Sequence, residues 1–97
     1  MNINGLLPVG SVVLLKNSTK RVVIIGVCQG VATEEGQKVY DYVGCPFPEG
    51  FMSADKNFLF NTDQIEKLFF IGYQDDEALA FKEKADALLE RVRAEEK

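Results

Sequence analysis

The sequence predicts an α+β fold in which a small, mainly antiparallel β-barrel or curled sheet of about five strands precedes one long C-terminal helix. Three observations support this: a β-branched run at residues 21–31, short apolar segments bounded by glycine, proline and polar residues, and helical periodicity after residue 74. An SH3-like barrel is one architecture of this class, and the strand order stays open. The 97 residues suit a single domain, with a β part at about 9–73 and the helix at about 75–95.

Two strands are predicted in the first third of the chain. Residues 8–11 form an entry turn, residues 12–16 the first strand, and the polar residues 17–20 a loop of hairpin length. The second strand occupies residues 21–31 and is apolar at both parities in its centre, which predicts that both of its faces are covered. Gly26 within this run predicts a bulge or bend, because bulges are a means by which sheets curl.

The third strand is predicted at residues 38–45, where Tyr40 and Tyr42 share one face. Residues 45–50 contain two prolines and a glycine, so they cannot continue as a central strand. Phe47 lies between the two prolines on a stiff segment with unpaired amides, which is a common setting for a recognition loop.

Two further strands follow a loop that ends at residue 57. The first is short, at residues 58–60, and Asn61 or Thr62 caps the single helical turn after it. The last strand is predicted at residues 67–73.

Two adjacent phenylalanines, Phe69 and Phe70, lie in this last strand. Alternate residues of a strand point to opposite faces, so at most one of the two rings enters a one-sided core. The other ring needs the helix or a partner chain to cover it. A second copy of this chain would cover it as well as another protein would, so a homodimer is one alternative.

Residues 75–95 are predicted to form an amphipathic helix with acidic residues in its first turn, where the helix macrodipole favours carboxylates. At ~1.5 Å per residue this helix is about 30 Å long, so part of its apolar stripe can project beyond its own domain. The stripe packs either on the chain's own sheet or on a helical partner. Its members are Ala78, Phe81, Ala85, Leu88, Leu89 and Val92.

The inventory of side chains argues against an enzyme and against a bound metal or cofactor. The chain has no histidine to serve as a proton shuttle, as a zinc ligand or as the base beside a serine or cysteine nucleophile. Its acidic residues do not follow an EF-hand pattern, and no phosphate-binding glycine loop is present. The net charge of −4 argues against nucleic-acid binding, which requires a basic face.

Charge and hydropathy also predict the compartment. The N-terminus has no positively charged region followed by an apolar run, and the longest apolar stretch, residues 22–28, is far short of the ~20 residues that cross a bilayer. The predicted helix is net acidic, unlike helices that bind membrane surfaces. We expect a soluble, cytoplasmic protein. Cys28 and Cys45 form no CxxC motif and lie beside apolar residues, so we expect free, buried thiols.

Aromatic and apolar side chains are the remaining candidates for function. Most aromatic residues of small domains belong to the core, whereas uncovered ones are typical of protein interfaces. The same two alternatives hold for the apolar stripe of the helix. The candidate partner-binding residues are Tyr40, Tyr42, Phe47, Phe51, Phe69, Phe70, Tyr73, Phe81, Leu88 and Val92.

Several ordered motifs within residues 6–77 resemble a known family. In combination they are similar to the domain of unknown function family 4176 (DUF4176), small proteins encoded beside type VII secretion toxins in Gram-positive bacteria. Thr62 stands where the family's FN-x-D-I segment is expected to have a histidine, so no role of that side chain is carried over. The motifs are LLPVGSVVLLK at 6–16, VIIG at 23–26, YDYVGCPFPEG at 40–50, FNTDQI at 60–65 and FIGYQDDE at 70–77.

The resemblance implies a cytoplasmic accessory protein, a targeting chaperone that binds the N-terminal helical region of an LXG toxin, with or without small helical-hairpin partners. The family offers no catalytic residues to transfer. The Phe-x-x-x-Asp export signal of helical-hairpin partners is absent, because Ala85 stands four residues after Phe81. The chain is thus expected to guide cargo. The alternative is an immunity protein that blocks a toxin domain, while a small-ligand or enzymatic role would need a polar pocket that the sequence does not reveal.

Overall fold

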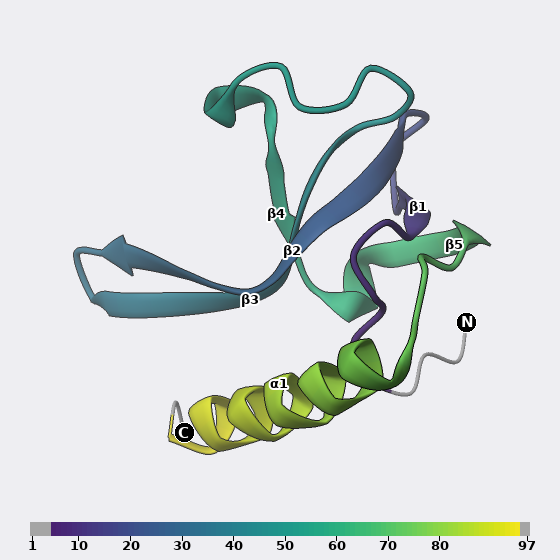
Figure 1. Cartoon of the computed structure of the whole chain (residues 1–97). Helices are drawn as coiled ribbons and strands as arrows, with labels where there is room; N and C mark the ends of the chain where they lie inside the picture. The colour runs from purple at the N-terminus through teal and green to yellow at the C-terminus, as the bar shows by residue number, and fades with distance from the viewer. Residues whose placement is uncertain (1–4, 96–97) are drawn as a thin grey trace.

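A five-stranded antiparallel sheet and one C-terminal helix form the protein in the computed structural model, which describes residues 5–95 (Figure 1). The strand order is β4-β3-β2-β1-β5, so β4 and β5 are the two edges and the curled sheet does not close into a barrel. The predicted fold class is confirmed in its curled-sheet form. The elements are β1 (Val12–Leu15), β2 (Arg21–Thr33), β3 (Gly36–Pro46), η1 (Ala54–Lys56), β4 (Phe58–Phe60), η2 (Thr62–Gln64), β5 (Ile65–Phe70) and α1 (Asp76–Glu95).

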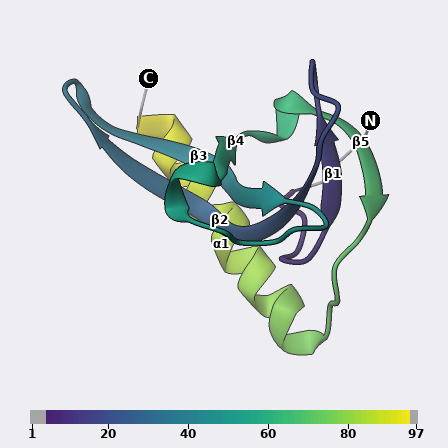
Figure 2. The same ribbon diagram turned by 90° about the horizontal axis from the view of Figure 1, so that it is seen from above.

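The longest pair of strands is the β2–β3 hairpin, whose tip extends beyond the other strands (Figures 1 and 2). Its register runs from Val22 opposite Pro46 to Thr33 opposite Gly36. Both strands are longer than predicted. Residues 32–37, the polar loop predicted between them, pair except at the two-residue turn 34–35.

A β-bulge confirms the bend predicted at Gly26. Ile24 pairs with Gly44 and Gly26 pairs with Val43, so Ile25 is the extra residue of β2. A Cβ atom at Gly26 would lie 2.9 Å from Cγ1 of Val43, so the bend leaves little room for a side chain at this position.

Pro46 ends β3 one residue beyond the predicted strand. β4 pairs with β3 only as far as Gly44 opposite Phe58, so at Pro46 the strand has a neighbour on one side. The N–H of Phe47 donates to the carbonyl of Arg21 at 2.9 Å. Since successive N–H groups alternate in direction, the N–H that proline lacks would face the side where β4 has ended, and no ladder hydrogen bond is lost.

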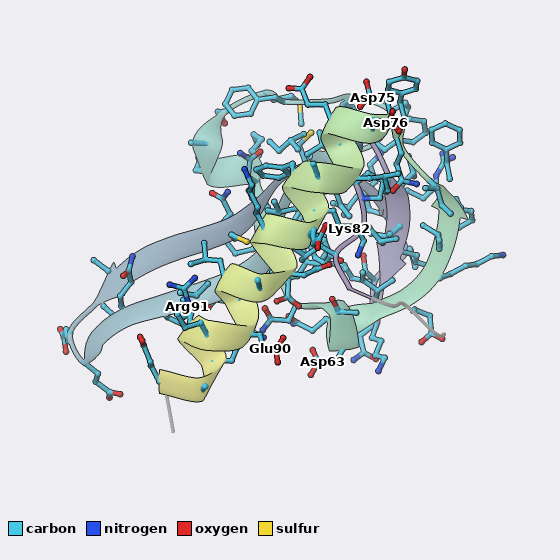
Figure 3. All side chains as sticks on the ribbon, turned by 60° about the horizontal axis from the view of Figure 1, so that its bottom comes forward. Asp63, Asp75, Asp76, Lys82, Glu90 and Arg91 are labelled. Atoms are coloured by element: carbon cyan, nitrogen blue, oxygen red, sulfur yellow. The ribbon has the colours of Figure 1, made fainter. Side chains whose placement is uncertain are left out.

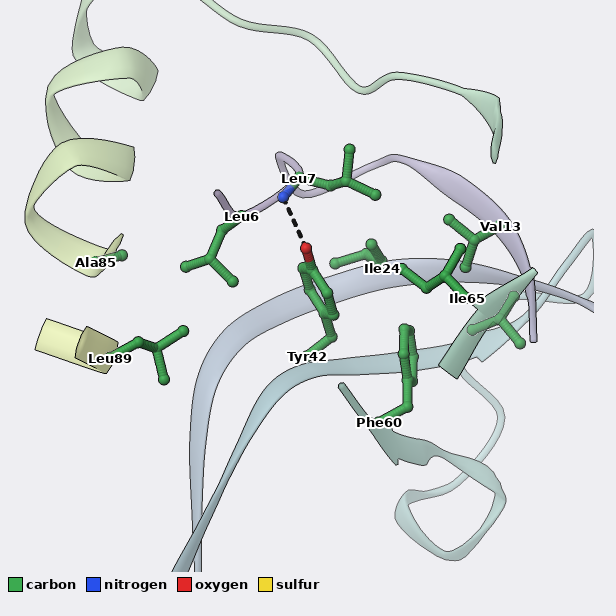
Figure 4. Packing of buried hydrophobic residues seen from close by; sticks show 10 residues of the cluster. Leu6, Leu7, Val13, Ile24, Tyr42, Phe60, Ile65, Ala85 and Leu89 are labelled. Atoms are coloured by element: carbon green, nitrogen blue, oxygen red, sulfur yellow. Dashed lines mark hydrogen bonds between the residues drawn. The ribbon is translucent and has the colours of Figure 1, made fainter. Parts of the chain in front are cut away.

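The main core lies on one face of the sheet, the inner face, where α1 and the N-terminal segment cover it (Figure 4). Tyr42 and Phe60 stack there with ring centroids 5.3 Å apart. The Tyr42 hydroxyl accepts a hydrogen bond from the N–H of Leu7 at 2.9 Å, which holds the N-terminal segment against the sheet. The cluster consists of Leu6, Leu7, Val13, Val22, Ile24, Tyr42, Phe60, Ile65, Ala85 and Leu89.

α1 packs on the inner face through Ala85 and Leu89, its two buried residues (Figure 4). The carboxylate of Asp75 accepts a hydrogen bond from the first turn and caps the helix. Phe81 and Leu88 belong to the predicted apolar stripe but are 57% and 44% exposed. Part of the stripe is therefore left uncovered by the chain's own sheet.

The prediction that both faces of β2 are covered is wrong. On the inner face Val22 and Ile24 are buried, whereas on the opposite, outer face Val23 is half-buried and Ile25 is exposed. The uncovered outer face could not be predicted, because a strand with apolar residues on both faces has the same sequence pattern whether or not a second layer covers it. The one α-helix among the described residues packs on the inner face, so the outer face carries apolar side chains without a helix above them.

Candidate protein-binding surfaces

The structure disperses the ten candidate partner-binding residues over several places. Tyr42 lies in the core with no exposed surface, so a partner cannot reach it and it leaves the candidate set. Tyr40, on the β2–β3 hairpin, is half-buried, and the ammonium group of Lys38 lies 5.2 Å from the centroid of its ring. Tyr42 is therefore a core residue, and Tyr40 is partly covered by its own chain.

Phe51 and Met52 form a separate exposed patch in the loop after β3, with 62% and 51% of their surfaces exposed. The depression beside Met52 has a volume of about 360 Å³. Lys20 and Glu49 line it and form a surface ion pair of 2.7 Å. Because this rim carries paired charges of both signs, it shows no preference for a charged ligand.

Phe69 and Phe70 lie on the same face of the sheet, contrary to the prediction that they point to opposite faces. Val13 pairs with Leu68, and both side chains pack in the inner core. Val12 pairs with Phe70, so Phe69 is the extra residue of a bulge in β5. The bulge breaks the strict alternation of side chains and puts both rings on the outer face with Val12.

An apolar row crosses the outer face from β5 to β3. Phe70 of β5 pairs with Val12 of β1. Val12 pairs in turn with Val23 of β2, which pairs with Cys45 of β3. Val12 and Cys45 are 7% and 1% exposed, although neither belongs to the inner core cluster. The outer face is therefore a second apolar surface and not the polar face that a one-sided sheet usually presents.

A trough of about 470 Å³ follows this row, and we name it the outer trough. Val12 and Val23 form its floor, while Phe69 and Phe70 stand on the β5 side and Phe47 on the β3 side. Phe69 and Phe70 are 47% and 60% exposed, so the wall on the β5 side projects into solvent. The lining consists of Gly10, Val12, Arg21, Val23, Phe47, Phe69 and Phe70.

Two cations flank the outer trough. The guanidinium of Arg21 lies 5.0 Å from the ring centroid of Phe47, and the ammonium of Lys67 lies 5.0 Å from that of Phe69. Both distances are within the range of a cation–π interaction, which fixes each positive charge beside an aromatic wall. None of the described residues that line the trough carries a carboxylate, and its lining is apolar apart from Arg21. Outside the lining, Lys67 flanks the β5 side, and Glu49 lies near Lys20 and Arg21, which together lower the pKa of its carboxyl group.

A second groove, the helix groove, lies between α1 and the N-terminal segment and has a volume of about 150 Å³. Tyr73 and Phe81 stand at its edge, 80% and 57% exposed. Asp75, which caps α1, and Asp76, its first residue, lie close by, and Lys82 faces the N-terminal segment (Figure 3). Its lining consists of Leu6, Leu7, Pro8, Val9, Val27, Tyr73, Gln74, Ala78, Phe81, Lys82 and Ala85.

A polar cluster fastens the other end of α1. Arg93 donates to the carboxylate of Asp41 at 2.8 Å and to the side-chain oxygen of Asn61 at 3.3 Å. The second carboxylate oxygen of Asp41 accepts the N–H of Thr62 at 2.8 Å. Asp41 is thus held on both oxygens, which suits a structural anchor better than an acid–base catalyst. Val92, next to the anchored arginine, is half-buried.

Both cysteines are free thiols, as predicted, but the expected burial holds for Cys45 only. Cys45 is buried, and Cys28 is half-buried with its sulfur 3.7 Å from the carbonyl oxygen of Ala85. Burial and the nearby carboxylates of Asp41 and Asp86 raise the pKa of Cys28 above its ordinary value. A thiol with a raised pKa stays protonated at neutral pH and is a poor nucleophile.

Neither a metal cluster nor a membrane span is found in the part of the chain that the structure describes. Within residues 5–95 no three histidine, cysteine, aspartate or glutamate side chains gather closely enough to hold a metal ion. The same residues contain no helix that is both long and apolar enough to cross a bilayer. What residues 5–95 offer is a pair of apolar surfaces, the outer trough and the helix groove.

Comparison with known proteins identifies the family of the chain. The model of a domain of unknown function, DUF4176, matches residues 6–81. The chain belongs to this family. No curated protein and no solved structure matches the chain. The DUF4176 match extends from the N-terminal segment through all five strands into the second turn of α1, so it includes the whole outer trough and the edge of the helix groove.

Sequence reasoning missed four residues that line the outer trough, Gly10, Val12, Arg21 and Val23, and the flanking Lys67. Val12 and Val23 look like any interior strand residues, and Arg21 and Lys67 look like isolated surface charges. Parity within β1 and β2 could have placed both valines on one face. The bulge at Phe69 has no glycine to mark it, so nothing in the sequence shows that Phe70 joins them.

Proposed function

We propose that this DUF4176 protein is a non-catalytic accessory protein of type VII secretion, a targeting chaperone that binds the N-terminal helical region of an LXG toxin in the cytoplasm. It binds alone or together with small helical-hairpin partners. The secretion context comes from the motifs that resemble the family. The single structural observation that supports a binding role is the outer trough, an apolar surface with exposed Phe69 and Phe70 that no helix within residues 5–95 covers.

The physical reason lies in the cost of exposed apolar surface. A contiguous aromatic patch on a soluble protein favours association, because covering it removes apolar area from water at about 25 cal/mol per Å². An amphipathic helix offers the complementary shape, a ridge of apolar side chains that fits a groove. The helix groove, with exposed Tyr73 and Phe81, provides a second such surface, so a cargo of several helices can contact both.

Co-purification tests the proposal. The tagged chain is co-expressed with the N-terminal helical region of the LXG toxin encoded beside it, with the C-terminal domain of the same toxin as the control. We expect a stable complex with the helical region in size-exclusion chromatography, and reduced export of the toxin when the gene is deleted. Binding to the C-terminal domain instead, with protection of cells that express that domain, would favour the immunity alternative and reject the chaperone.

A further inference from the structure

We propose that the outer trough binds a single α-helix whose apolar ridge is flanked by carboxylates. The identity of the helix as cargo rests on the proposed function, whereas the shape and charge of the trough stand on the structure alone. Three features carry the inference: the width of the trough, its apolar lining and its two cations.

The width fits one helix. The aromatic walls belong to β5 and to the end of β3, which are separated by three strand intervals in the order β3-β2-β1-β5. At about 4.8 Å per interval, the backbones of the two strands that carry the walls are roughly 14 Å apart. An α-helix with its side chains is about 10–12 Å across, so one helix fits between the walls along the strands, whereas a lone extended strand would leave the trough half empty.

The lining suits the apolar ridge of such a helix. The floor is made of the small side chains Val12 and Val23, on which the ridge can rest. Phe69 and Phe70 on one side and Phe47 on the other supply large rings that can pack against its flanks. Aromatic residues around an apolar centre are the composition that protein interfaces favour over the rest of a surface.

The charge suits carboxylates beside the ridge. Arg21 and Lys67 stand at opposite walls, each over the ring of its own wall, so a helix in the trough meets a cation on both flanks. The chain as a whole carries a net charge of −4, so these two positive charges beside the trough differ in sign from the protein's net charge. A flank of glutamate or aspartate would pair with both cations, and a flank of lysine would be repelled.

The same charges argue against a second copy of this chain as the occupant. A two-fold dimer brings the same patch of both copies together, so Arg21 and Lys67 of one copy would face the same cations of the other. Like charges at an interface disfavour association. The trough therefore selects an acidic amphipathic partner over itself.

A pair of synthetic peptides tests the chemistry of the trough independently of any cargo. Both are fluorescein-labelled amphipathic helices with the same leucine ridge, flanked by glutamate in one and by lysine in the other. By fluorescence anisotropy we expect the glutamate peptide to bind about tenfold or more tightly than the lysine peptide. The double variant Arg21→Glu, Lys67→Glu should reverse this preference. Equal affinities, or no binding of either peptide, would overturn the inference.

Variants of the complex with the helical cargo then locate the site. Phe70→Ser and the double charge reversal should each weaken binding about tenfold or more. Leu79→Ser, on an exposed position of α1 that lines neither groove, is the control and should change the Kd less than about twofold. Loss of binding in Phe81→Ser of the helix groove, with the trough variants unchanged, would reject the trough and leave the proposed function standing. If the wild-type chain binds no cargo, the proposed function fails and the peptides alone decide the inference. A dimer of the chain alone that Phe70→Ser disperses in sedimentation would place a second copy in the trough and overturn the inference.

Discussion

Tyr42 joins the inner core of the sheet to the N-terminal segment. Its ring stacks on Phe60 in the inner core, and its hydroxyl accepts the N–H of Leu7 at 2.9 Å. From the sequence, Tyr42 could be assigned to a strand. The sequence could not decide whether its side chain lies in the core or on a surface that a partner reaches, because tyrosine is common in both places. The hydroxyl explains the choice of tyrosine over phenylalanine, since it satisfies a buried N–H of the N-terminal segment.

Substitution of Tyr42 by phenylalanine tests this role and its pH dependence. Loss of the acceptor for Leu7 should lower the free energy of unfolding by about 1–2 kcal/mol at neutral pH. Burial raises the pKa of Tyr42 above its ordinary value near 10, so the unfolded chain releases this proton at a lower pH than the folded chain does. The wild type should therefore lose stability relative to Tyr42→Phe as the pH rises above about 10.

Urea unfolding followed by circular dichroism, for both proteins between about pH 8 and pH 11, measures this difference. The phenylalanine variant is itself the control for the other tyrosines and for the lysines, which titrate in both proteins. A stability gap that stays constant across the range would contradict the assigned shift of Tyr42.

At the scale of elements, the helix α1 presents two neighbouring leucines in different environments. Leu89 belongs to the core cluster and is 8% exposed, whereas Leu88 is 44% exposed on the uncovered part of the stripe. We expect Leu89→Ala to lower the free energy of unfolding by about 2–4 kcal/mol, because it leaves a cavity, and Leu88→Ala to lower it by less than about 1 kcal/mol. Denaturant titration of both variants checks the pair, and equal losses would show that α1 packs through a different face.

The connection between β5 and α1 depends on a close approach of two backbones at Gly72. Its N–H donates to the hydroxyl of Ser11 at 3.0 Å, and a Cβ atom here would collide with the carbonyl oxygen of Val9. We expect Gly72→Ala to destabilise the fold by about 3 kcal/mol. The clashing atom belongs to the backbone, which, unlike a side chain, cannot move aside by changing rotamer. Gly30→Ala is the control, because its Cβ would meet only the flexible end of Gln37. Similar thermal stability of the two variants would contradict this account.

The elements also show where sequence reasoning succeeds and where it fails. The strands, the bulge at Gly26 and the helix follow from local patterns of β-branched residues, glycine and helical periodicity, and the structure confirms them. The bulge at Phe69 does not follow, because an ordinary residue occupies it and its cause lies in the pairing with β1. One unpredicted bulge reverses the direction of Phe70 and so adds its ring to the apolar outer face.

At the scale of the whole molecule, the two faces of the sheet have different tasks. The inner face supplies the core, with the N-terminal segment and α1 above it. The outer face has an apolar row that no helix of the described part of the chain covers. Composition predicted a protein without catalytic equipment, and the aromatic residues predicted surplus apolar surface. The sequence could not predict that three of these aromatic residues gather in one trough, since that requires the strand order β3-β2-β1-β5.

If the outer face serves binding and the inner face serves stability, the two properties can be separated. The double variant Phe69→Ser, Phe70→Ser removes the exposed wall of the trough but no member of the inner core. We expect its free energy of unfolding to stay within about 1 kcal/mol of the wild type, because partly exposed rings contribute little to folding. Its binding of the apolar dye ANS should fall strongly, because the dye reports exposed apolar surface.

Phe60→Ser, in the core, should give the opposite result, a loss of about 3 kcal/mol or more in the free energy of unfolding and increased dye binding. A double variant that unfolds like Phe60→Ser would mean that the outer row is part of the folding core, and the case for the trough as a binding surface would then fall.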